Sequence, residues 1–338
     1  MLNNKIYVNG TAIGKGERPY IIAEVGSNFD QSLDKAKKLI DVAVAAGASA
    51  VKFQLFRADI LYPKKDGHYE AFKAVELNPD WVGTLSDHAG AQKIDFIASP
   101  FDRESVDVLE SVSVPAYKVA SSETTNLPLL GYIASKKKPI FISTGMCEMV
   151  DVEEAIKLCV DFENLDISIL QCGAMYPLPT KHANLNVIKT FMSRYECPVG
   201  FSDHTLDELS AIVAVGIGAN VFEKHFTMSK NDKGPDHFYA LEPDGLRRYI
   251  ESIHLAYEAL GNREKKFLPD ERMYGRREGL YAARDILEGS IVLDSDITVA
   301  RPALGIRARS ISGILGLKIQ GNVKKGDPIM WSNFNLKD

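Results

Sequence analysis

Cysteine is scarce and scattered in this chain of 338 residues. Its four cysteines form no CxxC pair and lie at Cys147, Cys159, Cys172 and Cys197. Such spacing supports neither a disulfide framework nor a zinc knuckle, because both need cysteines in paired positions. We therefore expect reduced and mostly buried thiols.

Long apolar runs and an excess of basic residues are also lacking. No segment approaches the roughly 20 apolar residues that span a bilayer, and the first residues form no apolar core flanked by positive charge. Lys and Arg total 40 against 45 for Asp and Glu, which gives a net charge of −5. Because nucleic-acid-binding surfaces are usually basic, this charge disfavours a nucleic-acid-binding protein. The lack of long apolar runs leads us to expect a cytoplasmic protein that does not bind membranes.

Familiar motifs of nucleotide binding and nucleophilic catalysis are missing as well. The glycine-rich segment GIGAN (216–220) leads from a helix to a strand, whereas a dinucleotide fingerprint leads from a strand to a helix. The sequence contains no serine elbow and no cysteine nucleophile motif. Its chemistry must therefore be sought in other residues.

Short β-branched runs alternate with amphipathic segments from residue 20 onward. Eight runs, each followed by a helical segment, cover 20–26, 50–56, 95–101, 116–123, 139–145, 167–173, 198–203 and 220–226. This alternation is typical of a parallel sheet. Eight evenly sized units over about 250 residues fit an α/β TIM (β/α)8 barrel better than a doubly wound sheet, although spacing alone does not exclude an open sheet.

A second, smaller domain is predicted after the barrel. The last predicted barrel helix, 242–260, ends at Gly261, a residue suited to a helix C-cap. Residues 261–278 are charged and aperiodic, so we interpret them as a linker between a barrel domain (1–260) and a mostly β domain (279–338). Because about 60 residues give only a thin core, we expect the small domain to pack on its own barrel or on that of a neighbouring subunit.

Polar residues gather at the predicted C-terminal ends of the strands, where the functional side chains of TIM barrels converge. Lys52 and Lys118 lie at two of these ends, and two ammonium groups in one confined mouth repel each other unless an anion separates them. Hydroxyl donors to that anion could come from Ser99, Ser121, Ser143 and Ser202. We infer a phosphorylated carboxylate substrate. The alternative is that the lysines pair with Glu24, Glu123 or Glu223 and have only a structural role at the barrel mouth.

Two histidines end adjacent predicted strands. The imidazoles of His204 and His225 could meet across the mouth and bind one divalent metal, with a carboxylate or water completing its shell. Asp203 and Glu223 lie beside them in the sequence. Asp236 follows in a Gly-Pro turn, where its carboxylate could accept substrate hydroxyls. Hydrogen-bonded structural roles for these residues remain the alternative.

Short motifs along nearly the whole chain resemble those of the sialic acid synthase family, which includes synthases for N-acetylneuraminic, legionaminic and pseudaminic acids and spore-coat relatives. They are IIAEVGSN (21–28), AVKFQ (50–54), SPFD (99–102), AYKVAS (116–121), ISTGM (142–146), GFSDHT (200–205), EKHF (223–226) and GPDH (234–237). Segments 281–306 and 315–329 resemble the family's antifreeze-like (SAF) domain. The resemblance implies a TIM barrel with that C-terminal domain, in a domain-swapped homodimer whose small domains each cover the partner's active site.

The resemblance also implies a role for each matched residue. It assigns phosphoenolpyruvate to Lys52, Ser99, Lys118, Ser121, Ser143 and Ser202. It assigns a Mn²⁺-type metal, with Mg²⁺ or Co²⁺ as alternatives, to His204 and His225. The sugar would face Gln54, Glu123, Tyr176 and Asp236, with Arg301 reaching it from the partner chain.

The implied reaction is that of a transferase that joins C3 of phosphoenolpyruvate to the aldehyde of an open-chain N-acetylmannosamine-type sugar. The metal would act as a Lewis acid on the aldehyde oxygen, and the lysines would stabilise charge on the enol acid. Water attack at C2 would then release phosphate by carbon–oxygen cleavage. Glu24 and Glu223 are the candidates for proton handling.

Two departures from the family pattern keep other functions open. Many members have His where this chain has Phe29, and Asn or Ser where it has Ala174. A sugar-binding barrel without turnover is one alternative. The other is a Schiff-base aldolase or lyase, because Lys118 on a barrel strand could act as a nucleophilic amine.

Overall fold

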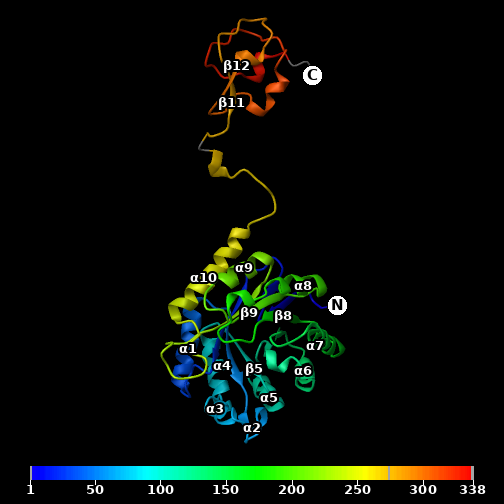
Figure 1. Ribbon diagram of the computed structural model, residues 1–338, viewed down its shortest axis with the longest axis vertical. Helices are drawn as coiled ribbons and strands as arrows, with labels where there is room; N and C mark the ends of the chain where they lie inside the picture. Colours follow the sequence, from blue (N-terminus) through cyan, green and yellow to red (C-terminus); the bar gives the residue numbers. More distant parts are fainter. Residues whose placement is uncertain (1, 273–274, 336–338) are drawn as a thin grey trace. The chain divides into compact units, whose positions relative to one another are not determined.

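The computed structural model of the chain (Figure 1) describes residues 2–272 and 275–335. It divides into two compact units, Met1–Gly261 and Asn262–Asp338. Within the described residues, no helix is both long and apolar enough to cross a membrane. The four cysteines are free; Cys159 and Cys172 are buried, whereas Cys147 and Cys197 are only partly buried.

Eight parallel strands close into a barrel in the first unit, in the order β10-β3-β4-β5-β6-β7-β8-β9. They are β3 Tyr20–Gly26, β4 Ala50–Leu55, β5 Asp95–Pro100, β6 Tyr117–Val119, β7 Ile140–Ser143, β8 Ile167–Cys172, β9 Val199–Asp203 and β10 Val221–His225. The predicted TIM barrel is therefore confirmed. β6 is shorter than the predicted run because the chain turns into a 3-10 helix, η2, at Ser121–Glu123.

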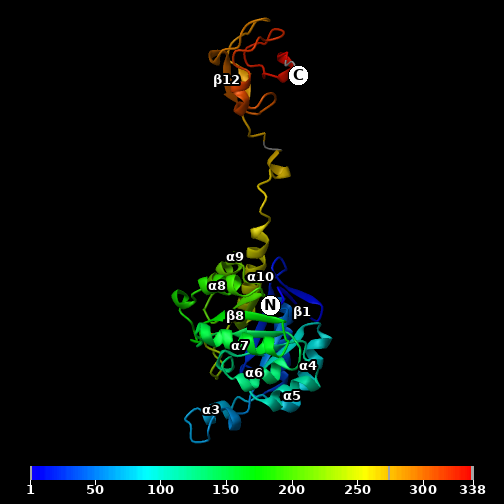
Figure 2. The ribbon, with the colours of Figure 1, turned by 90° about the vertical axis from the view of Figure 1, so that its right-hand side faces the viewer.

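Helices surround the barrel, as Figures 1 and 2 show. They are α1 Leu33–Ala46, α2 Ala58–Leu61, α3 Tyr69–Lys73, α4 Val82–Ala91, α5 Arg103–Ser111, α6 Leu127–Ala134, α7 Met149–Asp161, α8 Asn186–Arg194, α9 Leu209–Ile217 and α10 Pro243–Leu260. Local chemistry sets their ends: the Ser32 side chain accepts a hydrogen bond from the backbone N–H of Lys35 at the start of α1, and Gly47 ends that helix at φ 83°. The apolar faces of α1 and α10 pack into the same core as the outward side chains of the strands.

An N-terminal hairpin, β1 Lys5–Val8 and β2 Thr11–Gly14, was not predicted. Asn9 and Gly10 form its turn with positive φ values of 44° and 81°, as a two-residue hairpin turn requires. Its apolar face packs against the first residues of the barrel strands in a cluster of Ile6, Val8, Ile13, Tyr20, Ile22, Ala50, Ile97, Ala116, Phe141, Leu170 and Val221. The hairpin thus covers the N-terminal end of the barrel, and access is left at the opposite end.

The second unit has its own small core. Strands β11 Gly279–Ala282 and β12 Ile297–Ala300 pair antiparallel, and isolated bridges connect further segments. Its buried apolar residues are Leu280, Ala282, Ile286, Val292, Ile306, Ile314, Ile319, Val323, Ile329 and Phe334. The predicted mostly β character of this segment is confirmed.

Candidate active site

Side chains at the C-terminal ends of the eight strands converge on a small cavity of about 40 Å³, here called the inner cavity. Each strand contributes at least one side chain to the lining. The lining residues are Glu24, Lys52, Gln54, Ser99, Lys118, Ala120, Ser121, Ser143, Cys172, Tyr176, Ser202, His204, Glu223 and His225. This placement follows from strand geometry, because alternate residues point to opposite faces. On β10, Glu223 and His225 therefore face inward while Lys224 between them faces outward.

The two predicted lysines lie among carboxylates at the floor of this cavity. Lys52 Nζ is 2.8 Å from Glu24 Oε2 and 3.8 Å from Glu223 Oε2. Lys118 Nζ is 3.3 Å from Glu223 Oε1. All four side chains are at most 5% exposed, so their charges are poorly screened by water. The lysines thus pair with acids, and they also line the space where a ligand could bind.

Burial and pairing separate the acid–base behaviour of these groups. Burial raises the pKa of Glu24, and the opposing Lys52 does not fully offset it. Burial also opposes ionisation of Glu223, yet the ammonium groups of Lys118 and Lys52 outweigh it and lower its pKa to about 2. Burial lowers the pKa of Lys118. Glu24 is therefore the acid of the pair that accepts a proton more readily, and Glu223 remains an anion.

Hydroxyl groups surround the lysines. Lys52 Nζ donates to Ser99 Oγ at 3.1 Å, and Ser202 Oγ donates to Glu223 Oε1 at 3.0 Å. Ser121 Oγ accepts from the backbone N–H of Gly145 at 3.0 Å. Ser143 Oγ is buried and has no hydrogen-bond partner among the described residues. A buried polar atom left without a partner is costly, so Ser143 marks a place where a polar ligand atom would fit.

The two predicted metal-binding histidines do face each other, with ring centroids 5.6 Å apart. His204 Nδ1 lies 2.8 Å from the carbonyl oxygen of Gly173. Because a carbonyl only accepts, Nδ1 carries a proton, and in the neutral form of the ring Nε2 is then the nitrogen with the lone pair. Burial lowers the pKa of His225 to about 4, so this ring is neutral at pH 7. Neutral imidazoles are the form that divalent metals bind.

The protein alone offers few ligands for such a metal. In residues 2–272 and 275–335, no group of three or more His, Cys, Asp or Glu side chains is arranged to hold a metal ion. Asp203, which the sequence placed beside the histidines, points to the outer face of β9 and accepts hydrogen bonds from Thr205. The residues fit a two-histidine site whose remaining ligands would be water or substrate oxygens.

A second cavity of about 540 Å³, here called the outer cavity, adjoins the first. Both cavities are lined by Gln54, Ala120, Ser121, Tyr176 and His225. The rest of the outer lining is mostly apolar and consists of Ser27, Phe56, Leu61, Tyr62, Ala71, Phe72, Val75, Phe101, Ser122, Met146, Ala174, Pro235, Asp236 and Tyr239. No Lys or Arg occurs among the described residues that line it.

One predicted substrate residue of the barrel, Glu123, and one departure from the family pattern, Phe29, line neither cavity. Glu123 is buried, accepts a hydrogen bond from Asn126 Nδ2 at 2.8 Å and lines neither cavity. Arg301 belongs to the second unit, where its Nε lies 2.7 Å from Glu278 Oε1. Phe29 packs on Phe53 in the core, so this departure from the family pattern does not reach the site. Ala174, in contrast, does line the outer cavity.

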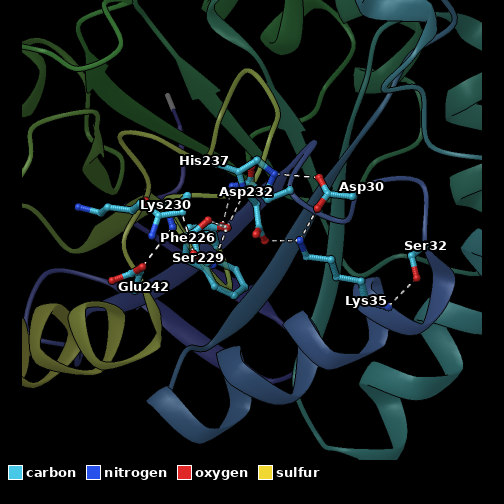
Figure 3. A network of polar contacts seen from close by, with 12 residues as sticks. Asp30, Ser32, Lys35, Phe226, Ser229, Lys230, Asp232, His237 and Glu242 are labelled. Carbon is cyan, nitrogen blue, oxygen red and sulfur yellow. Dashed lines mark hydrogen bonds and ion pairs between the residues drawn. The ribbon is translucent and has the colours of Figure 1, made fainter.

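The loop after β10 is fastened to the start of the first βα unit (Figure 3). His237 Nε2 lies 2.8 Å from Asp30 Oδ1, and Lys35 Nζ lies 2.6 Å from Asp232 Oδ2. Asp236 Oδ2 accepts from both the backbone N–H and the hydroxyl of Ser27, at 3.0 and 2.8 Å. These contacts hold Asp236 at the wall of the outer cavity.

A buried ion pair behind the site gives a stability prediction. Lys224 Nζ lies 3.2 Å from Asp203 Oδ2 on the outer face of the barrel, and Tyr249 donates to the same oxygen at 3.0 Å. We expect Lys224→Met to destabilise the protein by about 3–5 kcal/mol, because it leaves the Asp203 carboxylate buried without its cation. Urea unfolding would measure this loss. The double variant Lys224→Met/Asp203→Asn should recover most of it, and equal instability of both variants would contradict the pairing argument.

Comparison with known proteins shows which family the chain resembles over its length. It matches the NeuB family model over residues 39–265 and the SAF domain model over residues 277–335. It is 37% identical over 335 residues to the N,N'-diacetyllegionaminic acid synthase of Legionella pneumophila, covering 93% of this chain and 94% of that protein.

Solved structures agree with this match. The spore coat polysaccharide biosynthesis protein SpsE of Bacillus subtilis superposes with a TM-score of 0.71 at 32% identity, over 99% of this chain and 100% of that one. The N-acetylneuraminic acid synthetase of Leptospira borgpetersenii gives a TM-score of 0.76 at 27% identity, over 81% and 95% of the two chains. The chain therefore belongs to the NeuB family and carries a SAF domain at its C-terminal end.

Proposed function

We propose that this protein condenses phosphoenolpyruvate with an open-chain N-acetylated amino sugar, giving a nine-carbon sialic-acid-like product and phosphate. One observation carries the proposal: the ends of eight strands bring two buried ammonium groups, two carboxylates, four serine hydroxyls and two imidazoles to one cavity. The relatives named above for legionaminic and N-acetylneuraminic acid synthesis support the same reaction class.

The enol acid would bind at Lys52 and Lys118. Their ammonium groups and the partnerless hydroxyl of Ser143 provide donors for phosphate or carboxylate oxygens. The inner cavity has room for only a few water molecules. We therefore place one anionic end of phosphoenolpyruvate there and the rest of the molecule in the opening beside Gln54 and Tyr176 that both cavities share.

Glu24 is our choice for proton handling. Its pKa is raised by burial, whereas that of Glu223 is lowered. A carboxylate whose pKa lies closer to neutrality exchanges a proton more readily at pH 7. Gln54 Nε2 donates to Glu24 Oε1 at 2.7 Å and so orients this group toward the space that both substrates would share.

A divalent metal, which we propose to be Mn²⁺, would be held by His204 and His225. When bound, it would supply Lewis acidity toward the aldehyde of the amino sugar. His225 lines both cavities and His204 lines the inner one, so the aldehyde would enter from the outer cavity. That the chain forms a domain-swapped homodimer, in which Arg301 of one subunit contacts the sugar in the outer cavity of the other, remains a prediction.

The outer cavity suits a neutral acceptor with apolar substituents. Phe56, Tyr62 and Phe72 form one aromatic wall, with ring centroids 5.5 Å apart for Phe56 and Phe72 and 4.8 Å apart for Tyr62 and Phe72. Such rings pack well against methyl groups of acetamido or deoxy positions and offer few partners to hydroxyls. We therefore expect a neutral acetamido sugar to be a better acceptor than a phosphorylated one.

A phosphate-release assay tests the proposed function. Purified protein would receive phosphoenolpyruvate, Mn²⁺ and a panel of neutral and 6-phosphorylated N-acetylmannosamine-type sugars, including deoxy and diacetamido forms. Release should require both the enol acid and a sugar and should be fastest with the neutral, methyl-bearing sugars. Absence of release with every sugar would contradict the function, and preference for the phosphorylated sugars would contradict the acceptor assignment.

A Schiff-base aldolase is the second candidate, favoured by the burial that lowers the pKa of Lys118. Borohydride reduction in the presence of pyruvate distinguishes the two. The aldolase would gain a covalent pyruvate adduct at Lys118 and would work in the presence of EDTA. The proposed synthase should show no adduct and should lose phosphate release with EDTA.

A further inference from the structure

Tyr239, in the loop after β10, lies directly against one of the two histidines of the inner cavity. The tyrosine is buried, and its ring centroid is 5.2 Å from that of His225 in an edge-to-face arrangement. Its hydroxyl oxygen lies 2.7 Å from Asp236 Oδ1 and 3.4 Å from His225 Nδ1. Tyr239 therefore connects a fixed carboxylate to a candidate metal-binding ring.

The direction of these hydrogen bonds follows from the groups involved. An ionised carboxylate only accepts, so the single hydroxyl hydrogen of Tyr239 points to Asp236. The hydroxyl oxygen then has only lone pairs to offer to His225, whose Nδ1 must carry the hydrogen. The other carboxylate oxygen, Asp236 Oδ2, is held by two hydrogen bonds from Ser27, so the carboxylate cannot turn away easily.

The backbone is shaped to admit this arrangement. Gly26 ends β3 with φ 56°, and a Cβ at this position would lie 2.6 Å from Asp236 Oδ2 and 3.3 Å from the His225 ring. A side chain at residue 26 would thus push the carboxylate and the imidazole out of place. The close packing of Gly26, Asp236 and His225 leaves the histidine ring little freedom to rotate.

We propose that Tyr239 is a positioning residue that holds His225 in the Nδ1–H tautomer and so presents the Nε2 lone pair for metal binding. The carbonyl oxygen of Gly173 does the same for His204 at 2.8 Å. In both rings of the inner cavity, a hydrogen-bond partner at Nδ1 then leaves Nε2 free to bind the metal. Metal-binding histidines are commonly oriented by such a hydrogen bond to their second ring nitrogen. This inference rests on the proposed function, because the metal is part of that proposal.

The tautomer of His225 can be measured without metal or turnover. Protein labelled with ¹⁵N at histidine would be studied by NMR at neutral pH in the wild type and in Tyr239→Phe, and His225→Asn would assign the signal. In the wild type we expect His225 to have a protonated Nδ1 and an unprotonated Nε2. Tyr239→Phe should shift the ring toward a mixture of tautomers. An unchanged tautomer in Tyr239→Phe would overturn the proposal.

Metal affinity provides the second measurement, by calorimetric titration of Mn²⁺ alone. We expect Tyr239→Phe to raise the Kd about tenfold, the lower end of the usual effect of losing a group that orients a metal ligand. The matched control is Tyr20→Phe, which removes a tyrosine–carboxylate hydrogen bond of 2.6 Å to Asp95 at the other end of the barrel. The control should keep the wild-type Kd.

The outcomes separate the inference from the function on which it rests. Equal Kd values for the wild type and Tyr239→Phe would overturn the positioning role, even if the enzyme releases phosphate. A wild-type protein that binds no Mn²⁺ would overturn the metal site and, with it, the metal-binding half of the inference. The NMR result would still decide whether Tyr239 sets the tautomer of His225.

Discussion

Replacement of Lys118 by methionine is expected to lower phosphate release by about 10²–10³-fold, the usual cost of removing a group that stabilises developing charge. The ammonium group lies 3.3 Å from Glu223 Oε1 and lines the inner cavity, so both ligand binding and charge balance depend on it. The variant should also lose about 3–5 kcal/mol of stability, because Glu223 stays buried with only Lys52 nearby. The measurements are steady-state phosphate release and urea unfolding.

A double variant separates the two effects of this substitution. Lys118→Met/Glu223→Gln also neutralises the carboxylate that has lost one of its two lysine partners, so most of the lost stability should return while phosphate release stays low. Lys118→Arg keeps a cation but cannot form a Schiff base, and it should retain part of the activity of the synthase. A Lys118→Met protein that releases phosphate at the wild-type rate would contradict our assignment.

Loss of either His204 or His225 to alanine is expected to remove bound Mn²⁺ and to lower turnover by at least about 10²-fold. The described residues contain two facing imidazoles but no group of three or more His, Cys, Asp or Glu side chains arranged to hold a metal, so we expect one remaining ring to hold the ion poorly. Metal content after dialysis would be measured by atomic emission, and turnover by phosphate release.

The matched control for the histidine variants is His88→Ala. His88 lies on α4, where its Nε2 is 2.7 Å from Asp41 Oδ1, and it lines neither cavity. This variant should keep both metal and activity. If His204→Ala or His225→Ala also kept stoichiometric Mn²⁺ and wild-type turnover, the two-histidine site would be wrong.

Much of the fold could be predicted because each strand carries its own local signal. The β-branched runs and their spacing predicted all eight barrel strands, and Gly261 marked the end of α10, where it forms the C-cap. The β1–β2 hairpin was missed, although Asn9-Gly10 between alternating apolar residues is a strong local signal for such a turn.

The site was predictable where it follows from strand alternation. Lys52, Lys118, His204 and His225 line the inner cavity because they occupy inward positions at strand ends. The same alternation places Asp203, the sequence neighbour of His204, on the outer face of β9, away from the inner cavity.

Other parts of the site depend on contacts between distant loops. Tyr239 reaches His225 only because Asp236 is held by Ser27, more than 200 residues earlier in the chain. The aromatic wall of Phe56, Tyr62 and Phe72 likewise forms when the segment after β4 folds over the barrel mouth. Cys172 was overlooked because a single thiol has no motif, although its strand-end position would have placed it in the inner cavity.

A crystal structure of the protein with phosphoenolpyruvate and Mn²⁺, with anomalous data collected at the manganese edge, tests the central claim most directly. We predict one anomalous peak within bonding distance of Nε2 of both His204 and His225, and an anionic group of the enol acid in contact with Lys52 and Lys118. Manganese bound away from both imidazoles, or phosphoenolpyruvate bound outside the inner cavity and its opening, would contradict the account.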